Sequence, residues 1–557
     1  MKRTHARWLA VAVCASGYSC AHAPVQPRDS NAKTIAADDR PRLVVVMVVD
    51  QLGSWILERY LPYLSPQGAF RTGMASGAYH QTVSYLHAST FTAPGHAATY
   101  SGASPAKSGI CANVTWDRAT QKRVRVVDKG KRAWLSDPNF FASPEALRVS
   151  SVADVLSTST QGASQIVSLA YKDYAAVLAG GRNPSLVLWY APNGQPPGFT
   201  TSTYYAERLP DWLVIWQAHH RPEDYMEIWH PIDEELLQRI NGNDAGAGEI
   251  ECSGLGTLFP HDPQATVSPA LAFEGTPAAN EYLFDLAWES IERLDLGKDK
   301  VPDLLMISVS SPDVIGHCYG TESWEYLDNL MRLDTLIAAF VTKVSISIPT
   351  AFVLTSDHGA APMPEKRMRK HLPAGRIQTD ALATIIQRAI ENVMGEGQWV
   401  AHIEPPFVYL ANSIHQGPRR ERAVKAVLDT LSHVPGIEAA LDISDVANWR
   451  NIASTLRYPV GLSVSDNLDA DVYVLPSQYY IFDNDNKNGG TNHGTLWPYD
   501  RDVPFIMWGT GITHAESRER MDHRRVSSTI AALLQIPPPQ RMPLAPLEGV
   551  SSLLIAR

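Results

Sequence analysis

Three short apolar runs, each followed closely by an aspartate, constrain the fold of this chain more than any other feature. The runs are rich in β-branched residues and apolar on both faces, which is typical of strands buried inside a parallel sheet. In open α/β sheets, ligands bind at the carboxyl ends of the strands. We therefore expect the three aspartates to meet at one edge of a sheet. The runs and their aspartates are Leu43–Val49 with Asp50, Leu304–Val309 with Asp313, and Ala351–Leu354 with Asp357.

Three histidines accompany these aspartates. Carboxylate oxygens and imidazole nitrogens are ligands that suit zinc. Six such side chains suffice for two Zn²⁺ ions with three protein ligands each, which is the ligand set of a two-metal hydrolase. The competing interpretation is structural, because aspartates at strand ends cap helices and Asp–His pairs form ordinary hydrogen bonds. The histidines are His317 shortly after Asp313, His358 directly after Asp357, and His493 in the segment Asn492-His493-Gly494.

A segment between the first and second of these strands contains a candidate nucleophile. Pro94 fits the first turn of a helix and Gly102 fits its end. Thr92 then lies at the helix entrance, where free backbone N–H groups and the helix dipole favour an anion. A hydroxyl held there against a divalent cation becomes an alkoxide that can attack phosphorus.

Competing interpretations of this segment stay open. Threonine is a favoured N-cap residue, so Thr92 is on its own more typical of a cap than of a nucleophile. Thr90 is a second candidate nucleophile, although it lies two residues farther from the helix start. His96 lies one turn inside the helix and is interpreted as a packed core histidine rather than a ligand.

Two further polar residues are candidates for contacts with a phosphoryl group. The amide of Asn113 can donate a hydrogen bond to a phosphoryl oxygen, although asparagine is equally common in turns. Lys172 follows the apolar run Ile166–Tyr171 and so lies at a further expected strand end. The alternative for Lys172 is plain surface exposure.

The order of the expected elements predicts an α/β fold. Strand-like runs alternate with helical segments from Pro41 to about Gly180, resume at about Val301, and end with the run Val503–Gly509. This alternation favours a mostly parallel central sheet flanked by helices. Two insertions, at about residues 182–300 and 362–492, separate the candidate metal strands, and we expect both to emerge at the carboxyl edge and form a cap over the site. The formal net charge of −10 argues against nucleic-acid binding.

The N-terminus has the pattern of an export signal. Lys2, Arg3 and Arg7 precede an apolar stretch that is too short to span a bilayer. We interpret residues 1–20 as a signal segment, residues 21–40 as a linker, and residues 41–557 as the catalytic domain. Export to the periplasm is expected, with Cys20 as a possible site of lipid anchoring because it lies in a loose lipoprotein-like motif.

Cysteine usage gives little further information. Cys111, Cys252 and Cys318 lie outside the N-terminal segment, and their spacing does not match a zinc finger. One disulfide is permissible in an exported protein, but the sequence does not assign the pair.

These motifs together resemble the phosphate-irrepressible alkaline phosphatases of the alkaline phosphatase superfamily. Each motif alone is weak, but six of them in the same order form a specific pattern that extends from about Pro41 almost to the C-terminus. The motifs are Val48-Val49-Asp50-Gln51, Phe91-Thr92-Ala93-Pro94-Gly95-His96, Tyr171-Lys172-Asp173, Asp313 with His317, Ser356-Asp357-His358-Gly359 and Asn492-His493-Gly494.

The resemblance implies a fold and a role for each site residue. It implies an alkaline-phosphatase-like sandwich with cap insertions and a phosphothreonine intermediate at Thr92. Asn113 and Lys172 match positions that contact the phosphoryl group in this family. The implied ligands of the first zinc are Asp50, Asp357, His358 and the Thr92 oxygen, and those of the second zinc are Asp313, His317 and His493.

The chain departs from the family pattern at one position. The family usually has an arginine two residues beyond the lysine, and this chain has Tyr174. An arginine fork can hold a dianionic phosphoryl group through two parallel hydrogen bonds, whereas a phenol has a single donor. Tyr174 therefore leaves the preference between phosphate monoesters and diesters open.

We predict an exported, zinc-dependent phosphomonoesterase that acts on small phosphate esters. The alternative is a phosphodiesterase or nucleotide pyrophosphatase with the same two metals, since those relatives lack the Lys–Arg pair. A non-catalytic exported binding protein with a vestigial site is the third hypothesis.

Overall fold

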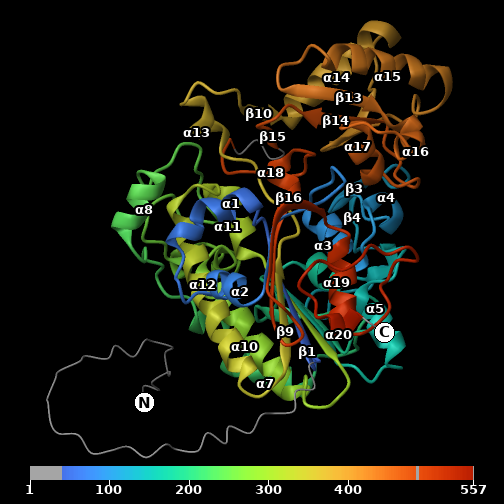
Figure 1. Ribbon diagram of the computed structural model, residues 1–557. Helices are drawn as coiled ribbons and strands as arrows, with labels where there is room; N and C mark the ends of the chain where they lie inside the picture. Colours follow the sequence, from blue (N-terminus) through green and yellow to red (C-terminus); the bar gives the residue numbers. More distant parts are fainter. Residues whose placement is uncertain (1–39, 484–487, 556–557) are drawn as a thin grey trace, which may run out of the picture. The chain divides into compact units, whose positions relative to one another are not determined.

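A nine-stranded mixed sheet forms the centre of the described part of the computed structural model, which covers residues 40–483 and 488–555 (Figure 1). The strand order is β17-β2-β16-β9-β1-β8-β5-β6-β7, and five of the eight neighbouring pairs are parallel. The strands are β1 (Leu43–Val49), β2 (Ala78–Ser84), β5 (Ile166–Ala170), β6 (Leu186–Ala191), β7 (Gly198–Thr200), β8 (Asp303–Val309), β9 (Thr350–Thr355), β16 (Asp502–Gly509) and β17 (Ala515–Asp522). The expected signal segment, Cys20 and the linker up to residue 39 lie outside the described residues.

The three strands expected from the apolar runs lie side by side in the middle of this sheet. β1 pairs in parallel with β8 on one side and with β9 on the other. Val49 is opposite Val309, and Val48 is opposite Thr355, so the three strands end at the same edge. Each residue of these strands is buried, as expected for strands covered on both faces. The predicted α/β fold with a mostly parallel sheet is confirmed.

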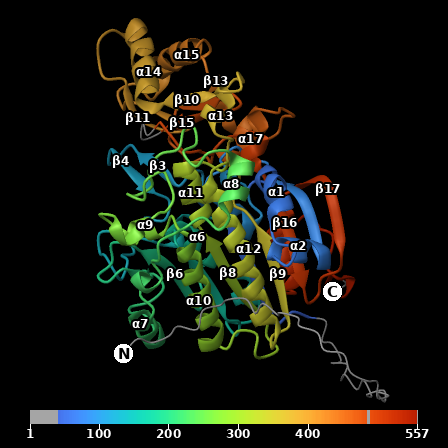
Figure 2. The same cartoon turned by 90° about the vertical axis from the view of Figure 1, so that its left-hand side faces the viewer.

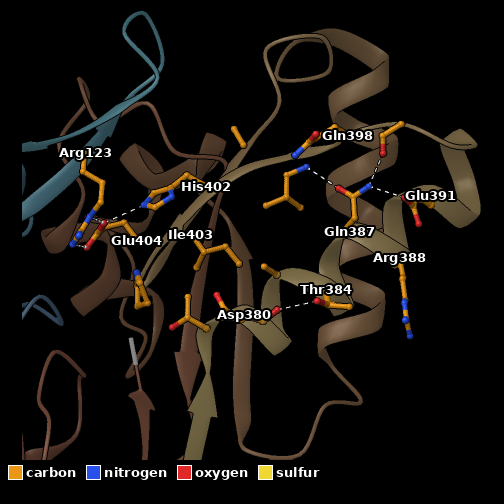
Figure 3. A pocket seen from close by; sticks show the side chains of 16 residues that line it. Arg123, Asp380, Thr384, Gln387, Arg388, Glu391, Gln398, His402, Ile403 and Glu404 are labelled. Carbon is orange, nitrogen blue, oxygen red and sulfur yellow. Dashed lines mark hydrogen bonds and ion pairs between the residues drawn. The ribbon is translucent and has the colours of Figure 1, made fainter. Parts of the chain in front are cut away.

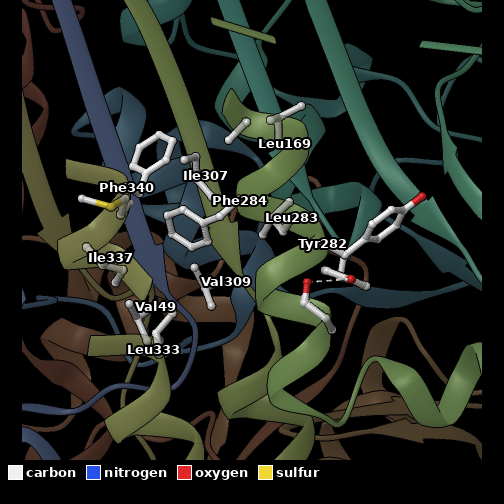
Figure 4. Close-up of a cluster of buried hydrophobic side chains, with 14 of the residues drawn as sticks. Val49, Leu169, Tyr282, Leu283, Phe284, Ile307, Val309, Leu333, Ile337 and Phe340 are labelled. Carbon is white, nitrogen blue, oxygen red and sulfur yellow. Dashed lines mark hydrogen bonds between the residues drawn. The ribbon is translucent and has the colours of Figure 1, made fainter. Parts of the chain in front are cut away.

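Helices cover both faces of the sheet because alternate side chains of each strand point in opposite directions. Val45, Met47 and Val49 belong to a core that includes residues of α10 (Pro277–Arg293) and α12 (Trp324–Ser345). Val44, Val46 and Val48 belong to a second core that includes residues of α19 (Arg525–Leu533). Figures 1 and 2 show α10 and α12 over one face, and Figure 4 shows their packing on Val49 and Val309.

Part of the first insertion joins the central sheet, although the whole insertion was expected to emerge above the site. Its strands β6 and β7 extend the central sheet beyond β5, and its helix α10 contacts β5 and β8. The physical reason is that β6 is buried along its whole length and α10 has an apolar face, and such surfaces are stabilised by packing in or against a sheet. The insertion also contains α7 (Asp211–His219), α8 (Glu234–Asn241) and α9 (Pro269–Phe273).

The second insertion has its own core. Its four-stranded sheet has the order β11-β12-β14-β13, and α14 (Thr379–Met394) and α15 (Gly417–Leu431) share a hydrophobic cluster with it. Near the start and the end of the insertion lie β10 (Gly375–Gln378) and β15 (Tyr480–Asp483). These two strands pair in parallel. The strands of the sheet are β11 (Val400–Glu404), β12 (Phe407–Leu410), β13 (Ile437–Asp442) and β14 (Val472–Pro476).

Side-chain contacts join this insertion to a hairpin of the catalytic core. The hairpin consists of β3 (Val114–Asp117) and β4 (Lys122–Arg125). Arg123 binds the Glu404 carboxylate through two hydrogen bonds of 2.6 and 2.9 Å, and Trp116 stacks on His402 at 4.4 Å between ring centroids. The insertion is therefore held against the part of the core that carries Asn113.

A disulfide joins Cys252 to Cys318, which assigns the pairing that the sequence left open. Cys318 lies in α11 (Ser311–Tyr319), directly after His317, so the bond connects the first insertion to the helix that carries two candidate ligands. Cys111 is a buried free cysteine. In the described part of the chain, no helix has the length and apolar character needed to span a bilayer.

Candidate active site

The predicted ligands converge at the carboxyl edge of β1, β8 and β9. Asp50 follows β1 directly, Asp357 lies two residues beyond β9, and Asp313 lies in the first turn of α11, which begins after β8. Pro312 favours that first turn because it needs no backbone N–H there. The parallel register places three aspartates that are far apart in sequence at one point.

Asp50, Asp357 and His358 form the first compact group. One ligand-type atom from each lies within 4.8 Å of the others, and all three side chains are fully buried. His358 Nε2 is 3.4 Å from Asp50 Oδ1 and 3.5 Å from Asp357 Oδ2. These are the three side chains that the family resemblance implied as ligands of the first metal.

The second compact group is Asp313, His358 and His493, so His358 belongs to both groups. His493 Nε2 is 3.5 Å from Asp313 Oδ1, and the His358 and His493 rings stack at 3.7 Å between centroids. His317 is not in either group, but its Nε2 is 3.2 Å from Asp313 Oδ1. Its side chain is 38% exposed, which makes it the most accessible of the six.

All three imidazoles are oriented in the same way. The Nδ1 atoms of His317, His358 and His493 lie 3.0, 2.9 and 2.7 Å from the backbone carbonyl oxygens of Thr491, Gly359 and Thr90. Because a carbonyl only accepts, each Nδ1 must carry the proton and donate it. Each Nε2 therefore faces the aspartates, and in a neutral imidazole it presents there the lone pair that a metal requires.

Burial and neighbouring charges shift the pKa values of the candidate ligands. Burial and the charges of Asp313 and Asp357 raise the pKa of Asp50 well above its usual range. Burial also raises the pKa of Asp357, to about 7. Burial lowers the pKa values of His358 and His493 to about 3, which keeps both imidazoles neutral. Carboxylates that resist ionisation beside neutral imidazoles form a site that favours a bound cation.

Lys172 lies between the two groups. Its Nζ donates to Asp50 Oδ2 at 2.6 Å and to Asp313 Oδ2 at 2.5 Å. Burial opposes its charge, but the carboxylates of Asp313 and Asp50 outweigh this and hold the pKa of Lys172 well above its usual range. Burial likewise opposes ionisation of Asp313, yet the charges of His317 and Lys172 hold the pKa of Asp313 well below its usual range.

The residues present fit a metal ion. Within the described residues, Asp50 Oδ1 and Asp357 Oδ2 are buried without a hydrogen-bond partner. A buried carboxylate oxygen without a partner is costly, and a metal ion would satisfy it. Both atoms face His358 Nε2, so the unsatisfied oxygens and the free lone pair point into the same space.

Thr92 is the first residue of α3 (Thr92–Ser101), and Phe91 occupies the N-cap position. The interpretation of Thr92 as a plain cap is therefore wrong. Its Oγ1 is 3.3 Å from His358 Nε2, so the hydroxyl points at the metal groups. Thr90 is excluded as a competitor because its hydroxyl donates to the Thr495 carbonyl at 2.8 Å and its carbonyl accepts from His493.

The start of α3 has a close packing contact that the sequence analysis missed. A Cβ atom on Gly95 would lie 2.2 Å from the Asp357 backbone oxygen, so only glycine allows this approach of helix and ligand. His96 is fully buried as expected, and its Nε2 lies 3.2 Å from Ser308 Oγ. A glycine inside a helical segment can be noticed in the sequence, but only the packing shows that it allows the close contact with Asp357.

Asn113 and Tyr174 lie beside this helix. Asn113 Oδ1 accepts a hydrogen bond from the Ala93 backbone N–H at 2.8 Å, which satisfies one free donor at the start of the helix. The amide NH₂ group of Asn113 is not used in this contact. Tyr174 lies in the first turn of α6 (Asp173–Gly180) and packs against the cluster that contains Ala93. Burial raises the pKa of the Tyr174 phenol, so the phenol stays neutral and can donate.

A cleft of about 330 Å³ lies beside the candidate ligands, with Phe91, Asn113, His317 and His493 in its lining. Its outer wall includes Arg123, Glu404 and Pro405, which also line a larger groove of about 790 Å³ between α14 and β11. Figure 3 shows this groove, in which Gln387 and Glu391 are hydrogen-bonded to each other. The cleft can therefore hold a phosphoryl group, and the groove leaves room for a larger leaving group.

Arg376 is a further residue that sequence reasoning missed, and it has no signal in the sequence. It binds Glu365 through two hydrogen bonds and donates to the backbone oxygens of Gly489 and Gly490. These glycines lie shortly before His493, so Arg376 fixes the chain that leads to this ligand.

Comparison with known proteins agrees with the geometry. Residues 44–495 match the model of the type I phosphodiesterase / nucleotide pyrophosphatase family. The chain belongs to this family. It is 28% identical to alkaline phosphatase PhoV of Synechococcus elongatus over 95% of its own length and 96% of that protein. It is 27% identical to a calcium-transporting ATPase of Myroides odoratus over 89% and 92% of the two chains.

The fold of this family member has also been seen in a solved structure. The crystal structure of alkaline phosphatase PafA superposes with a TM-score of 0.84 at 23% identity, covering 92% of this chain and 99% of that one. Family and fold together confirm the predicted membership of the alkaline phosphatase superfamily, in its phosphate-irrepressible branch. The chain is a phosphoric ester hydrolase, and the hypothesis of a non-catalytic binding protein is not supported.

Proposed function

We propose that the protein is an exported, zinc-dependent phosphomonoesterase that works through a phosphothreonine intermediate at Thr92. The single observation that carries the proposal is the 3.3 Å approach of the Thr92 hydroxyl to His358 Nε2, beside two groups of metal-ligand atoms. Relatives named as alkaline phosphatases support the monoesterase activity.

Zinc fits the donor set better than magnesium or calcium, which favour oxygen ligands alone. Asp50, Asp357 and His358 would hold one ion and Asp313, His317 and His493 the other, with His358 close to both groups. When bound, the ions would lower the pKa of the Thr92 hydroxyl and stabilise negative charge on the attacking and leaving oxygens.

The protein side chains carry the remaining steps. Thr92 Oγ1 loses its proton to solvent, attacks phosphorus in line with the leaving group, and forms the Oγ1–P bond as the P–O bond to the alcohol breaks. The departing alkoxide takes a proton from solvent. Water then attacks the phosphothreonine, which regenerates the Thr92 hydroxyl and releases inorganic phosphate.

Three groups of the chain position the phosphoryl oxygens. The free N–H groups at the start of α3 and the helix dipole favour a dianion beside Thr92. The Asn113 amide nitrogen can donate because its oxygen is already used by Ala93 N–H. Lys172 holds the aspartates of both metal groups together and lies within reach of the same space.

The proposal is tested with Thr92→Ala and metal analysis. The variant is expected to keep two zinc ions per chain and to lose nearly all hydrolysis of an aryl phosphate. In the wild type, acid quenching during turnover should trap one phosphoryl group, located at Thr92 by peptide mass spectrometry. Full activity in Thr92→Ala, or a phosphoryl group on Thr90, would refute the assignment of the nucleophile.

Phosphodiester hydrolysis is the second candidate function. It is favoured by Tyr174 at the position of the usual arginine and by the family's description as phosphodiesterases. The ratio of kcat/KM for an aryl phosphate and for its methyl diester decides between the two. A clear preference for the diester would replace the monoesterase proposal while leaving Thr92 as the nucleophile.

Export follows from the N-terminal pattern alone. We propose that residues 1–20 are removed or that Cys20 is lipidated, and that the enzyme acts in the periplasm. Intact mass measurement of the protein from the native host distinguishes a cleaved N-terminus from a diacylglyceryl-modified Cys20. Detection of the unprocessed Met1 form in the cytoplasm would contradict export.

A further inference from the structure

Gln51, the residue directly after Asp50, has an unusual backbone conformation. Its φ is +69°, in the left-handed region that side chains other than glycine, asparagine and aspartate rarely adopt. Its side chain is fully buried. Such a conformation persists only where the surrounding contacts hold it in place, and it is common beside functional sites.

The contacts of Gln51 reach both metal groups. Its side-chain Nε2 donates to Asp313 Oδ1 at 2.7 Å. Its backbone N–H is directed at Asp357 Oδ1 over 3.4 Å. Gln51 therefore touches one carboxylate of each group although it contributes no ligand atom itself.

The Asp313 carboxylate is held on both of its oxygens. Lys172 binds Oδ2 at 2.5 Å, and Gln51 binds Oδ1, the oxygen that faces His317 and His493. With both oxygens bound, the carboxylate cannot rotate about its χ2 bond. Without Gln51, Asp313 Oδ1 would be left with the two imidazoles that are themselves candidate ligands.

Gly316 makes room for the Gln51 side chain. A Cβ atom on Gly316 would lie 1.8 Å from Gln51 Oε1, so any larger residue in this turn of α11 would displace the amide. Oε1 is buried without a hydrogen-bond partner in the described part of the structure. The amide orientation is nevertheless determined, because the flipped form would place Oε1 against the carboxylate oxygen of Asp313.

We propose that Gln51 is a positioning residue, which together with the gap at Gly316 holds Asp313 in the orientation that binds the second metal ion. The inference rests on the proposed two-zinc function and deepens it. Partners of this kind, which orient a ligand without touching the metal, typically contribute about 10- to 100-fold to metal affinity.

The test measures zinc affinity and not only activity. Gln51→Glu keeps the size of the side chain but replaces the donor with an acceptor, and Gly316→Ala displaces the native amide. In a competition titration of the purified holoenzyme with a chelator, both variants should lose one zinc ion about 10 to 100 times more readily than the wild type. The other ion should be retained, and added zinc should restore kcat.

Gln161 offers a matched control. It is also a glutamine with positive φ, +54°, but it is exposed and lies between α5 (Val152–Ser159) and β5. Gln161→Glu should leave both zinc affinities unchanged. A shared effect of both Gln→Glu changes would show that backbone strain or added charge, rather than the contact with Asp313, is responsible, and would overturn the inference.

The outcomes separate this inference from the proposed function. A wild-type enzyme with two zinc ions, together with Gln51→Glu and Gly316→Ala variants of unchanged zinc affinity, would overturn the positioning role alone. A wild-type enzyme without zinc would overturn the proposed function and the inference with it. If excess zinc does not restore the bound zinc of Gln51→Glu, that variant is misfolded. The zinc affinity of Gly316→Ala, which leaves Gln51 itself unchanged, then decides whether the positioning role holds.

Discussion

Replacing Tyr174 with arginine tests how this enzyme chooses between monoesters and diesters. Tyr174 lies in the first turn of α6, two residues after Lys172. The charges of Lys172, Asp50 and Asp313 all influence the pKa of its phenol. An arginine at this position would bring a permanent positive charge in place of the phenol.

The size of the effect follows from the charges around Lys172. This ammonium is shared between Asp50 at 2.6 Å and Asp313 at 2.5 Å, so little of its charge remains to balance a dianionic phosphoryl group. An arginine fork can bind two phosphoryl oxygens, and hydrogen bonds to charged groups contribute about 1.5–3 kcal/mol against about 0.5–1.5 kcal/mol for a neutral donor. We expect Tyr174→Arg to raise kcat/KM for a monoester about 10- to 100-fold.

A diester should gain much less from the arginine. One of its oxygens carries an alkyl group and its net charge is smaller by one, so its hydrogen bonds to the arginine fork are weaker. The assay compares kcat/KM for an aryl phosphate and its methyl diester in wild type, Tyr174→Arg and Tyr174→Phe. The phenylalanine variant removes a single neutral donor and should lower monoester turnover less than about tenfold.

Tyr63 provides the control for added charge, because it is 39% exposed and lies in a short 3-10 helix (Leu61–Tyr63) that contains no candidate site residue. Tyr63→Arg should leave the monoester to diester ratio unchanged. If Tyr174→Arg retains its zinc and the ratio is unchanged or falls, the reasoning from phosphoryl charge is refuted.

Three further predictions concern positions around the site. Replacing Cys252 and Cys318 with serine removes a crosslink across 66 residues. It should lower the free energy of unfolding by about 2–5 kcal/mol in denaturant titrations and speed the loss of zinc to a chelator. An unchanged denaturation midpoint would contradict this. Gly95→Ala places a Cβ against the Asp357 backbone and should lower both the melting temperature and kcat, whereas a gain in stability from helix propensity alone would refute the packing argument. Burial raises the pKa of Glu274 to about 8, so its contribution to stability is full below about 4.5 and is lost as the pH rises through about 8. The melting temperature of Glu274→Gln should therefore fall less than that of the wild type between pH 6 and 9, and parallel curves would contradict this.

The sequence alone led to much of the fold and to the composition of the site. Runs such as Leu43–Val49 carry their own signal, because a strand covered on both faces must be apolar at every position. The position of Asp50 at a strand end follows from the same run. The resemblance of the motifs to one family then identified the superfamily, which the comparisons confirm.

Several features could not be read from local patterns. The argument for Thr92 over Thr90 depends on Thr495, whose backbone carbonyl accepts a hydrogen bond from the Thr90 hydroxyl. The first insertion was expected above the site, yet β6 and α10 pack into the central sheet and onto its face because both have apolar surfaces to bury.

The neighbours of the ligands were equally hidden. Gln51 and Asp313 are 262 residues apart, and the close approach of Gly316 to the Gln51 amide exists only after α11 has docked. Periodicity reports which face of an element is buried, because that depends on residues two to four positions apart. Which side chains then meet is decided by packing between distant segments, and only the tertiary structure contains that information.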